Sequence, residues 1–218
     1  MKSVKKRHTL SDRGEATRQK IIERAAPVFN RHGYAGTALS ELMEVTGLQK
    51  GGIYRHFSGK EELACEAFLF AWKRATAPRM EGLCETDGAV DRLRLLVRNF
   101  VHRVPPLPGG CPLMNTAVDA DDTNPALLQL ARKAFRDWRA LLMKIVREGQ
   151  RQGEMRRDLS PGSVADLLIG SLEGALLIGR IEGNRNALCS AQKHLDGWIQ
   201  SLACRAGVRK LSQKRKAA

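Results

Sequence analysis

Residues 46–63, TGLQKGGIYRHFSGKEEL, place two adjacent glycines directly before a compact run of aromatic and charged side chains. Glycine is the poorest helix former after proline, yet the chain on both sides repeats apolar residues every three or four positions, as helices do. Within the stretch, Ile53 and Phe57 have the spacing of one buried helical face. The stretch therefore predicts a short helix over about residues 49–57 whose glycines, Gly51 and Gly52, need an explanation other than helix stability.

Helical segments lie on both sides of this stretch. They cover residues 15–32, ended by Gly33, residues 38–45, ended by Gly47, and residues 60–75, followed by Pro78. Pro27 lies inside the first segment and lacks a backbone donor, so we expect a kink or a local compensation there. Two short helices joined by a glycine turn have the proportions of a helix-turn-helix.

The residues of the second short helix suit contact with DNA. A glycine has no β-carbon, so its backbone can approach a DNA groove closely. This would explain why glycine occupies positions 51 and 52. Several hydrogen-bond donors are spaced so that they could contact phosphates and base edges together. They are Lys50, Tyr54, Arg55, His56 and Lys60. The alternative is that the glycines only make a loop and the charged side chains are solvated.

Four motifs follow one another here nearly without gaps. They are an RxxIIxxAxxxF helix, an HGYxGT turn, the TGLxKGGIYRHF segment and FxxKEEL. Together they make residues 15–75 resemble the DNA-binding domain of the tetracycline-repressor (TetR/AcrR) family of bacterial transcriptional regulators.

The resemblance implies a role for each matching position. It assigns backbone phosphates to Thr37 and Lys50, bases to Gln49, Lys50, Gly51 and Gly52, the phosphodiester clamp to Tyr54 and His56, and the next helix start to Lys60. Family members carry Ser, Thr or Ala where this chain has the two glycines. That departure leaves recognition to DNA shape and to four side chains, Gln49, Lys50, Tyr54 and Arg55.

The remaining two thirds of the chain resemble the family in architecture only. Helices are expected over residues 88–104, from Pro112, from a cap at Thr123 or Asn124, over residues 160–183 and over residues 187–203. We therefore predict an all-α protein with an N-terminal three-helix helix-turn-helix domain and a larger helical ligand-binding and dimerisation domain. The predicted boundaries are a basic tail at 1–14, the DNA-binding domain at 15–75, the second domain at 76–204 and a basic tail at 205–218.

The last two predicted helices carry more apolar surface than one chain is expected to bury, which suggests a self-complementary dimer interface. In the family these helices form a four-helix bundle, and a dimer would place two recognition helices about 34 Å apart on a pseudo-palindrome. The predicted interface residues are Leu168, Leu172, Ala175, Leu176, Leu195, Trp198 and Leu202. The alternative is that both helices are ordinary core.

The resemblance also implies a small-molecule effector pocket enclosed by the helices from Lys60 to Trp138. Apolar residues punctuated by a few polar ones suit such a pocket. The candidates are Phe68, Trp72, Phe100, His102, Met114, Asn115, Trp138, Leu142 and Glu173. Helical spacing already explains the aromatic candidates as core, and the proline break beside His102 indicates a surface histidine.

Cys111 precedes a predicted helix in a glycine-rich break, where a thiol of lowered pKa would serve as a redox or electrophile sensor. The alternative, commoner for a free cysteine, is a small buried hydrophobic residue. The acidic run at residues 119–122 lacks the ligand spacing of a calcium loop, and the five scattered cysteines lack the CxxC spacing of a zinc site. We predict no metal and no cofactor.

The net charge of +14 lies mainly at the two ends of the chain. Residues 1–14 carry five basic and one acidic side chain, and residues 205–218 carry six basic and none acidic. Both segments lack a periodic apolar face and are expected to be disordered. Residues 15–60 carry seven basic and four acidic side chains, so the DNA-binding segment keeps a modest excess of its own.

Two other functions stay open. A protein that coats DNA nonspecifically through its basic tails would show a steep salt dependence. A helical enzyme using His102, Cys111 and Asp119 is the other, although the sequence contains no recognised catalytic motif.

The sequence has no apolar run of about 18 residues and no secretory signal, which predicts a cytoplasmic protein with no membrane partner. The interpretation that accounts for most residues is a homodimeric, ligand-released repressor. Its expected partners are double-stranded operator DNA, a second copy of itself and a small-molecule effector. The helix over residues 60–75 would couple the effector to DNA binding.

Overall fold

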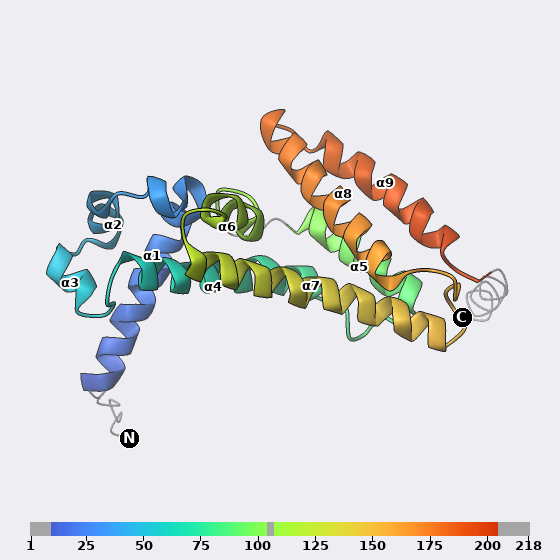
Figure 1. Ribbon diagram of the computed structural model, residues 1–218, viewed down its shortest axis with the longest axis horizontal. Helices are drawn as coiled ribbons and strands as arrows, with labels where there is room; N and C mark the ends of the chain where they lie inside the picture. Colours follow the sequence, from blue (N-terminus) through green and yellow to red (C-terminus); the bar gives the residue numbers. More distant parts are fainter. Residues whose placement is uncertain (1–9, 104–106, 205–218) are drawn as a thin grey trace, which may run out of the picture. The chain divides into compact units, whose positions relative to one another are not determined.

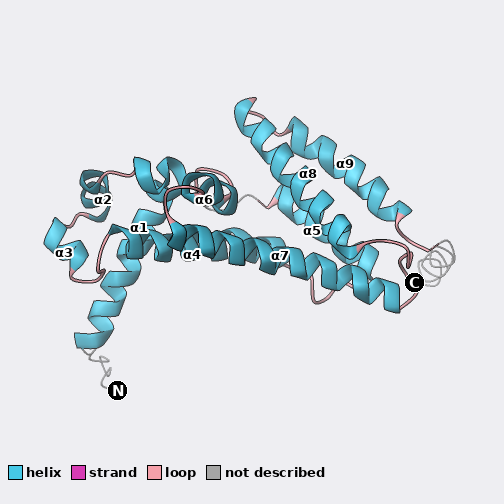
Figure 2. Cartoon of the chain, in the orientation of Figure 1, coloured by secondary structure: helices cyan, strands magenta, loops and turns pink. Residues whose placement is uncertain are grey.

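The structure, a computed structural model, describes residues 10–103 and 107–204. These residues form helices joined by short connections (Figure 1). They contain no β-strand (Figure 2), which confirms the predicted all-α class. Close contacts group the described residues into two compact units, residues 10–74 with 107–132 and residues 75–103 with 133–204. The predicted tail at 205–218 and residues 1–9 of the other tail lie outside the described residues.

The first unit contains the helix-turn-helix. Its helices are α1 (Leu10–Gly36), α2 (Leu39–Thr46), α3 (Lys50–Tyr54), most of α4 (Lys60–Thr76), α6 (Pro112–Ala120) and the start of α7 (Pro125–Arg151). The helix α3 is shorter than the predicted 49–57, but Ile53 and Phe57 are buried, as predicted. Residues 10–14 are helical rather than part of a tail, because they continue α1 without needing an apolar face of their own.

The helix α1 changes direction at Gly33 and not at Pro27. Within α1, Gly33 is the residue with non-helical torsion angles, φ 72° and ψ 177°. That combination is open essentially to glycine alone. The kink that we expected at Pro27 is absent from the torsion angles of α1, so the missing donor is accommodated in regular helix.

The turn between α2 and α3 is fixed by glycine and by a basic side chain. Gly47 has φ 69°, and its N–H donates to the carbonyl of Met43 at 2.9 Å, as expected of a left-handed C-cap. The guanidinium of Arg24, on α1, donates to the carbonyl of Thr46 at 3.0 Å. Both contacts satisfy carbonyls at the end of α2, so the direction in which the chain enters α3 is set locally.

Residues 107–132, which we placed in the second predicted domain, pack with the first unit instead. The side chain of Asn30 donates to the carbonyl of Pro108 at 2.7 Å, and Asn115 donates to the carbonyls of Gly109 at 2.7 Å and Asn30 at 2.8 Å. These part-buried amide contacts tie the loop before α6 to α1. No local pattern marks the contacts with Asn30, because their partners lie 78 and 85 residues away along the chain.

The second unit is built around two C-terminal helices. Its elements are a 3₁₀ turn, η1 (Ala77–Met80), then α5 (Ala89–His102), the rest of α7, α8 (Pro161–Ile181) and α9 (Asn186–Ser201). The helix α9 packs against both α5 and α8. The hydroxyl of Ser160 accepts from the N–H of Ser163 at 3.3 Å and caps α8. None of the described helices has the length and apolar character needed to cross a membrane.

Candidate nucleic-acid interface

The residues predicted to contact DNA form one continuous surface stretch of the first unit. Gln49, Lys50, Gly51 and Arg55 are exposed, and Gly52, Tyr54, His56 and Lys60 are half-buried. Ile53 and Phe57, between them, are anchored in the core at 0% and 2% exposure. The stretch therefore exposes polar groups to solvent, while the buried side chains of Ile53 and Phe57 fix its backbone in place. We call it the 49–60 surface.

Gln49 begins α3 with its backbone only. Its carbonyl accepts from the N–H groups of Gly52 at 2.8 Å and Ile53 at 3.2 Å. Its side chain makes no capping hydrogen bond, although a polar side chain at this position often does. The exposed amide of Gln49 is therefore not used to begin α3, which suits contact with an outside partner.

The two glycines of α3 differ in what surrounds them. A β-carbon at Gly51 would have nothing within 4 Å, whereas one at Gly52 would meet Cβ of Leu48 at 3.4 Å. Neither glycine has a positive φ. A glycine inside a helix is less stable than alanine by about 1 kcal/mol. The fold of the protein thus does not require glycine at position 51, and close approach of another molecule would.

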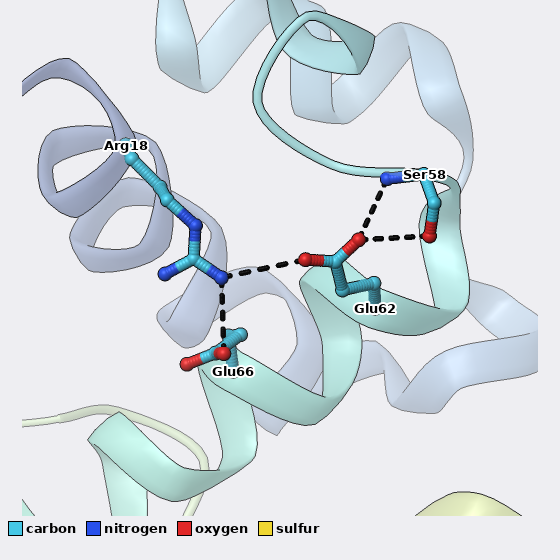
Figure 3. A network of polar contacts seen from close by, with 4 residues as sticks. All are labelled: Arg18, Ser58, Glu62 and Glu66. Atoms are coloured by element: carbon cyan, nitrogen blue, oxygen red, sulfur yellow. Dashed lines mark hydrogen bonds and ion pairs between the residues drawn. The ribbon is translucent and has the colours of Figure 1, made fainter. Parts of the chain in front are cut away.

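A network of charged side chains holds the end of the 49–60 surface against α1 and α4 (Figure 3). The guanidinium of Arg18 contacts the carboxylates of Glu62 at 3.4 Å and Glu66 at 3.0 Å, and it also lies over the ring of Phe57. Glu62 accepts from the N–H of Ser58 at 2.7 Å and from its hydroxyl at 2.8 Å. These hydrogen bonds, with the charge of Arg18, hold the pKa of the Glu62 carboxyl below its usual value.

Replacing Glu62 with glutamine should make the protein less sensitive to acid. Because the folded pKa of Glu62 is lowered, its stabilising contribution is complete above the unfolded pKa, near 4.5, and is lost as pH falls through the folded pKa. Between about pH 6 and about pH 3 the urea midpoint should therefore fall further for the wild type than for Glu62→Gln. Glu85→Gln, at an exposed position, is the control. Equal losses for the wild type and Glu62→Gln would contradict the assignment.

Lys60 contacts an aromatic ring as well as solvent. Its ammonium lies 4.6 Å from the ring centroid of Tyr34. Partial burial lowers the pKa of Lys60 and raises the pKa of Tyr34. Lys60 is thus held close to α1, at the edge of the 49–60 surface.

Thr37 is not presented for contact with phosphate. Its side chain is 2% exposed, and its hydroxyl donates to the carbonyl of Gly33 at 2.6 Å. This burial gives Thr37 a structural role, and the phosphate contact that the resemblance implies for it stays a prediction. The hydroxyl donates to a carbonyl at the break in α1.

The predicted effector residues fall into separate places. Phe68 and Asn115 line a small cavity in the first unit. The side-chain amide of Asn115 is already hydrogen-bonded there to the loop before α6. Phe100, Trp138 and Leu142 line a cavity in the second unit, with the two aromatic rings stacked at 6.0 Å. The residues that line neither of these cavities are Trp72, His102, Met114 and Glu173. His102 is exposed, as its place beside a proline break suggested.

The predicted interface residues lie mostly inside one protomer. Leu168, Leu172, Ala175, Leu195 and Leu202 are buried, and Leu176 and Trp198 are half-buried. Leu168 and Leu172 face the cavity lined by residues of η1, α5 and α7, so these two side chains belong to the core of one protomer. Apolar side chains of α8 that stay 49–74% exposed are Leu167, Leu177, Ile178 and Ile181.

Cys111 precedes α6 and is 2% exposed. Reactive cysteines lie in partly exposed sites, so this burial favours the alternative of a small buried hydrophobic residue. Asp119, placed in the acidic run, accepts from the N–H of Tyr34 at 2.6 Å and has a structural role. In residues 10–103 and 107–204, no group of three or more His, Cys, Asp or Glu residues has a metal-site arrangement.

Sequence reasoning missed the supporting residues Arg18 and Arg24. The spacing from Ser58 to Glu61 is that of a capping box and could have indicated a contact at Ser58, although the carboxylate that accepts is that of Glu62. No local signal marked the two arginines, because their partners lie more than 20 residues away.

In this protein the polar 49–60 surface is exposed and the apolar residues of the helix-turn-helix are buried beneath it. This is the arrangement of helix-turn-helix DNA-binding proteins. Over 175 residues the chain is 31% identical to the HTH-type transcriptional repressor DhaR of Mycobacterium sp. (strain GP1), which covers 78% of this chain and 86% of that protein. The chain belongs to the tetR family of bacterial regulatory proteins, and is a DNA-binding transcriptional regulator.

Family models and solved structures agree with this assignment. The model described as "Bacterial regulatory proteins, tetR family" matches residues 21–67, and "Tetracyclin repressor-like, C-terminal domain" matches residues 89–195. A TetR-family regulator from Cytophaga hutchinsonii is 35% identical with a TM-score of 0.81, covering 92% of this chain and 100% of that one. Another, from Chloroflexus aurantiacus J-10-FL, is 39% identical with a TM-score of 0.83, covering 88% and 98%. These matches favour neither tail-driven coating of DNA nor an enzyme.

Proposed function

We propose that this chain is a repressor that binds a pseudo-palindromic operator as a homodimer, through the 49–60 surface, and leaves DNA when a small molecule binds the second unit. The observation that carries the DNA contact is Gly51, a helical glycine that the fold itself does not need. Lys50 and Arg55 flank it with exposed positive charge. The name of the DhaR relative, a transcriptional repressor, supports the direction of control.

The proposed homodimer uses the exposed face of α8. Leu177, Ile178 and Ile181 lie on neighbouring turns, Leu167 lies about three turns earlier on the same side as Ile178, and each is about half exposed or more. Single exposed apolar residues are ordinary, but four on one helix form a patch of the kind that marks interfaces. A two-fold contact through α8 would pair this patch with itself.

Replacing Lys50 with alanine should weaken operator binding about tenfold in each half-site, since one charge-assisted contact is lost. The measurement is a footprint on the DNA upstream of the gene, with excess nonspecific competitor, followed by titration at several salt concentrations. The slope of log affinity against log salt should fall by about one for each phosphate contact removed. Lys144→Ala, which removes the same charge from α7 in the second unit, is the matched control.

The same titration separates the proposal from tail-driven binding. Recognition through the 49–60 surface requires a protected pseudo-palindrome that is lost in Lys50→Ala and Tyr54→Ala but kept in Lys144→Ala. Uniform coverage that survives both changes and disappears when residues 1–9 and 205–218 are removed would contradict the proposal.

A further inference from the structure

The second unit contains a buried arginine that the DNA contact does not use. Arg79, in η1, is 4% exposed, and its guanidinium lies 4.0 Å from the ring centroid of Phe100. Its Nε and Nη1 are buried and have no hydrogen-bond partner among the described residues. The described carboxylates also form no ion pair with it within 4.0 Å.

The position of Arg79 is held by its backbone. The buried side-chain amide of Asn99, on α5, donates to the carbonyls of Arg79 at 3.1 Å and Glu81 at 2.9 Å. These bonds fasten η1 to α5, beside Phe100. The guanidinium is thus directed by a fixed backbone, and a long side chain that could have reached solvent stays buried instead.

A cavity opens in front of this guanidinium. Apart from Arg79 its lining is apolar or aromatic: Met80, Leu93, Leu96, Val97, Phe100, Trp138, Leu142, Leu168 and Leu172. The cavity encloses about 340 Å³ of empty space when its mouth and the solvent in it are included. The part that a water molecule can occupy holds about one such molecule, so a larger ligand enters by moving leucine side chains to other rotamers.

The charge of Arg79 decides what such a ligand must carry. A buried cation is costly unless it is paired and hydrogen-bonded, and contact with an aromatic face offsets only part of that cost. One cation among apolar residues suits a ligand with one negative charge and an apolar body. A phosphate monoester would bring up to two negative charges and leave one of them unpaired.

We propose that Arg79 binds the carboxylate of a hydrophobic monocarboxylic acid whose apolar body fills the cavity between η1, α5, α7 and α8. The claim that this ligand is the effector of the regulator rests on the proposed function. The claim that the ligand binds here rests only on Arg79 and the cavity.

The test compares acids with uncharged partners of the same shape. Octanoate, decanoate and 4-phenylbutanoate, and the amide of each, are titrated into the full-length protein by calorimetry. We expect at least one acid to bind, and to bind at least tenfold more tightly than its amide. Binding by none of the three acids, or equal binding of acid and amide, would overturn the site. This comparison uses the unaltered protein, so it does not depend on any variant folding.

Two variants then locate the contact. Arg79→Met, which keeps an unbranched apolar stem and removes the charge, should reduce acid affinity at least tenfold and leave amide affinity within about twofold. Arg98→Met, at an exposed position of α5, should leave both unchanged. Undiminished acid binding by Arg79→Met would place the ligand elsewhere and overturn the proposal.

Operator binding is measured separately, with and without the acid. If Lys50→Ala leaves operator binding intact, the proposed function fails, while the acid–amide comparison still decides the site. If the acid binds through Arg79 but DNA stays bound, the site stands and its coupling to DNA fails.

Discussion

Replacing Gly33 with alanine is expected to lower the free energy of unfolding by roughly 2–4 kcal/mol. The torsion angles of Gly33, φ 72° and ψ 177°, are strained for any residue with a β-carbon. A β-carbon there would also lie 2.4 Å from Oδ1 of Asp119, so the carboxylate must move. Moving it breaks the 2.6 Å hydrogen bond that Asp119 accepts from the N–H of Tyr34. Urea unfolding followed by circular dichroism measures the loss.

Gly36→Ala is the matched control for this change. Gly36 lies three residues further along α1, without a positive φ, and a β-carbon there would meet Cβ of His32 at an ordinary 3.8 Å. It should change stability by less than about 1 kcal/mol, in the favourable direction. If Gly33→Ala were as stable as Gly36→Ala, α1 would have to continue as regular helix through residue 33, and the packing of α6 on α1 would need another cause.

Local signals in the sequence located most of the helices. Gly47 marked the end of α2, where it has a left-handed conformation, and Gly33, expected to end a helix, marked the break inside α1. Ile53 and Phe57 were recognised as buried from their spacing alone. What these signals could not show is the partner of each break, since Asp119 meets Tyr34 across 85 residues of chain.

The faces of α8 could not be told apart from the sequence. Its apolar residues nearly surround the helix, so periodicity does not say which of them meet α9 and which stay exposed. The predicted interface set therefore fell on buried Leu168 and Leu172, while Leu177 and Ile178 are the exposed ones. Arg79 was missed for a similar reason, because nothing in a short APRM segment shows that an arginine will be buried.

Replacing Gly51 with leucine is expected to raise stability and to weaken operator binding about a hundredfold. Leucine is a better helix former than glycine by about 0.5–1 kcal/mol, and a β-carbon at position 51 has nothing within 4 Å to meet. The new side chain would occupy the space in which DNA approaches α3. A clash of about 1.4 kcal/mol in each of two half-sites multiplies to about a hundredfold in affinity. Unfolding and operator binding are measured on the same preparation, so loss of fold cannot account for loss of binding.

Gly14→Leu separates this effect from a general response to a larger side chain. Gly14 lies inside a helix, α1, as Gly51 lies inside α3. Like Gly51 it has no positive φ, and a β-carbon there would have nothing within 4 Å. It should gain a similar amount of helix stability and bind the operator as the wild type does. Gly51→Ala provides an intermediate step, because alanine is among the residues that family members carry there. If Gly51→Leu bound the operator as tightly as Gly14→Leu, DNA would not approach α3 at this residue, and Gly51 would no longer support recognition through the 49–60 surface.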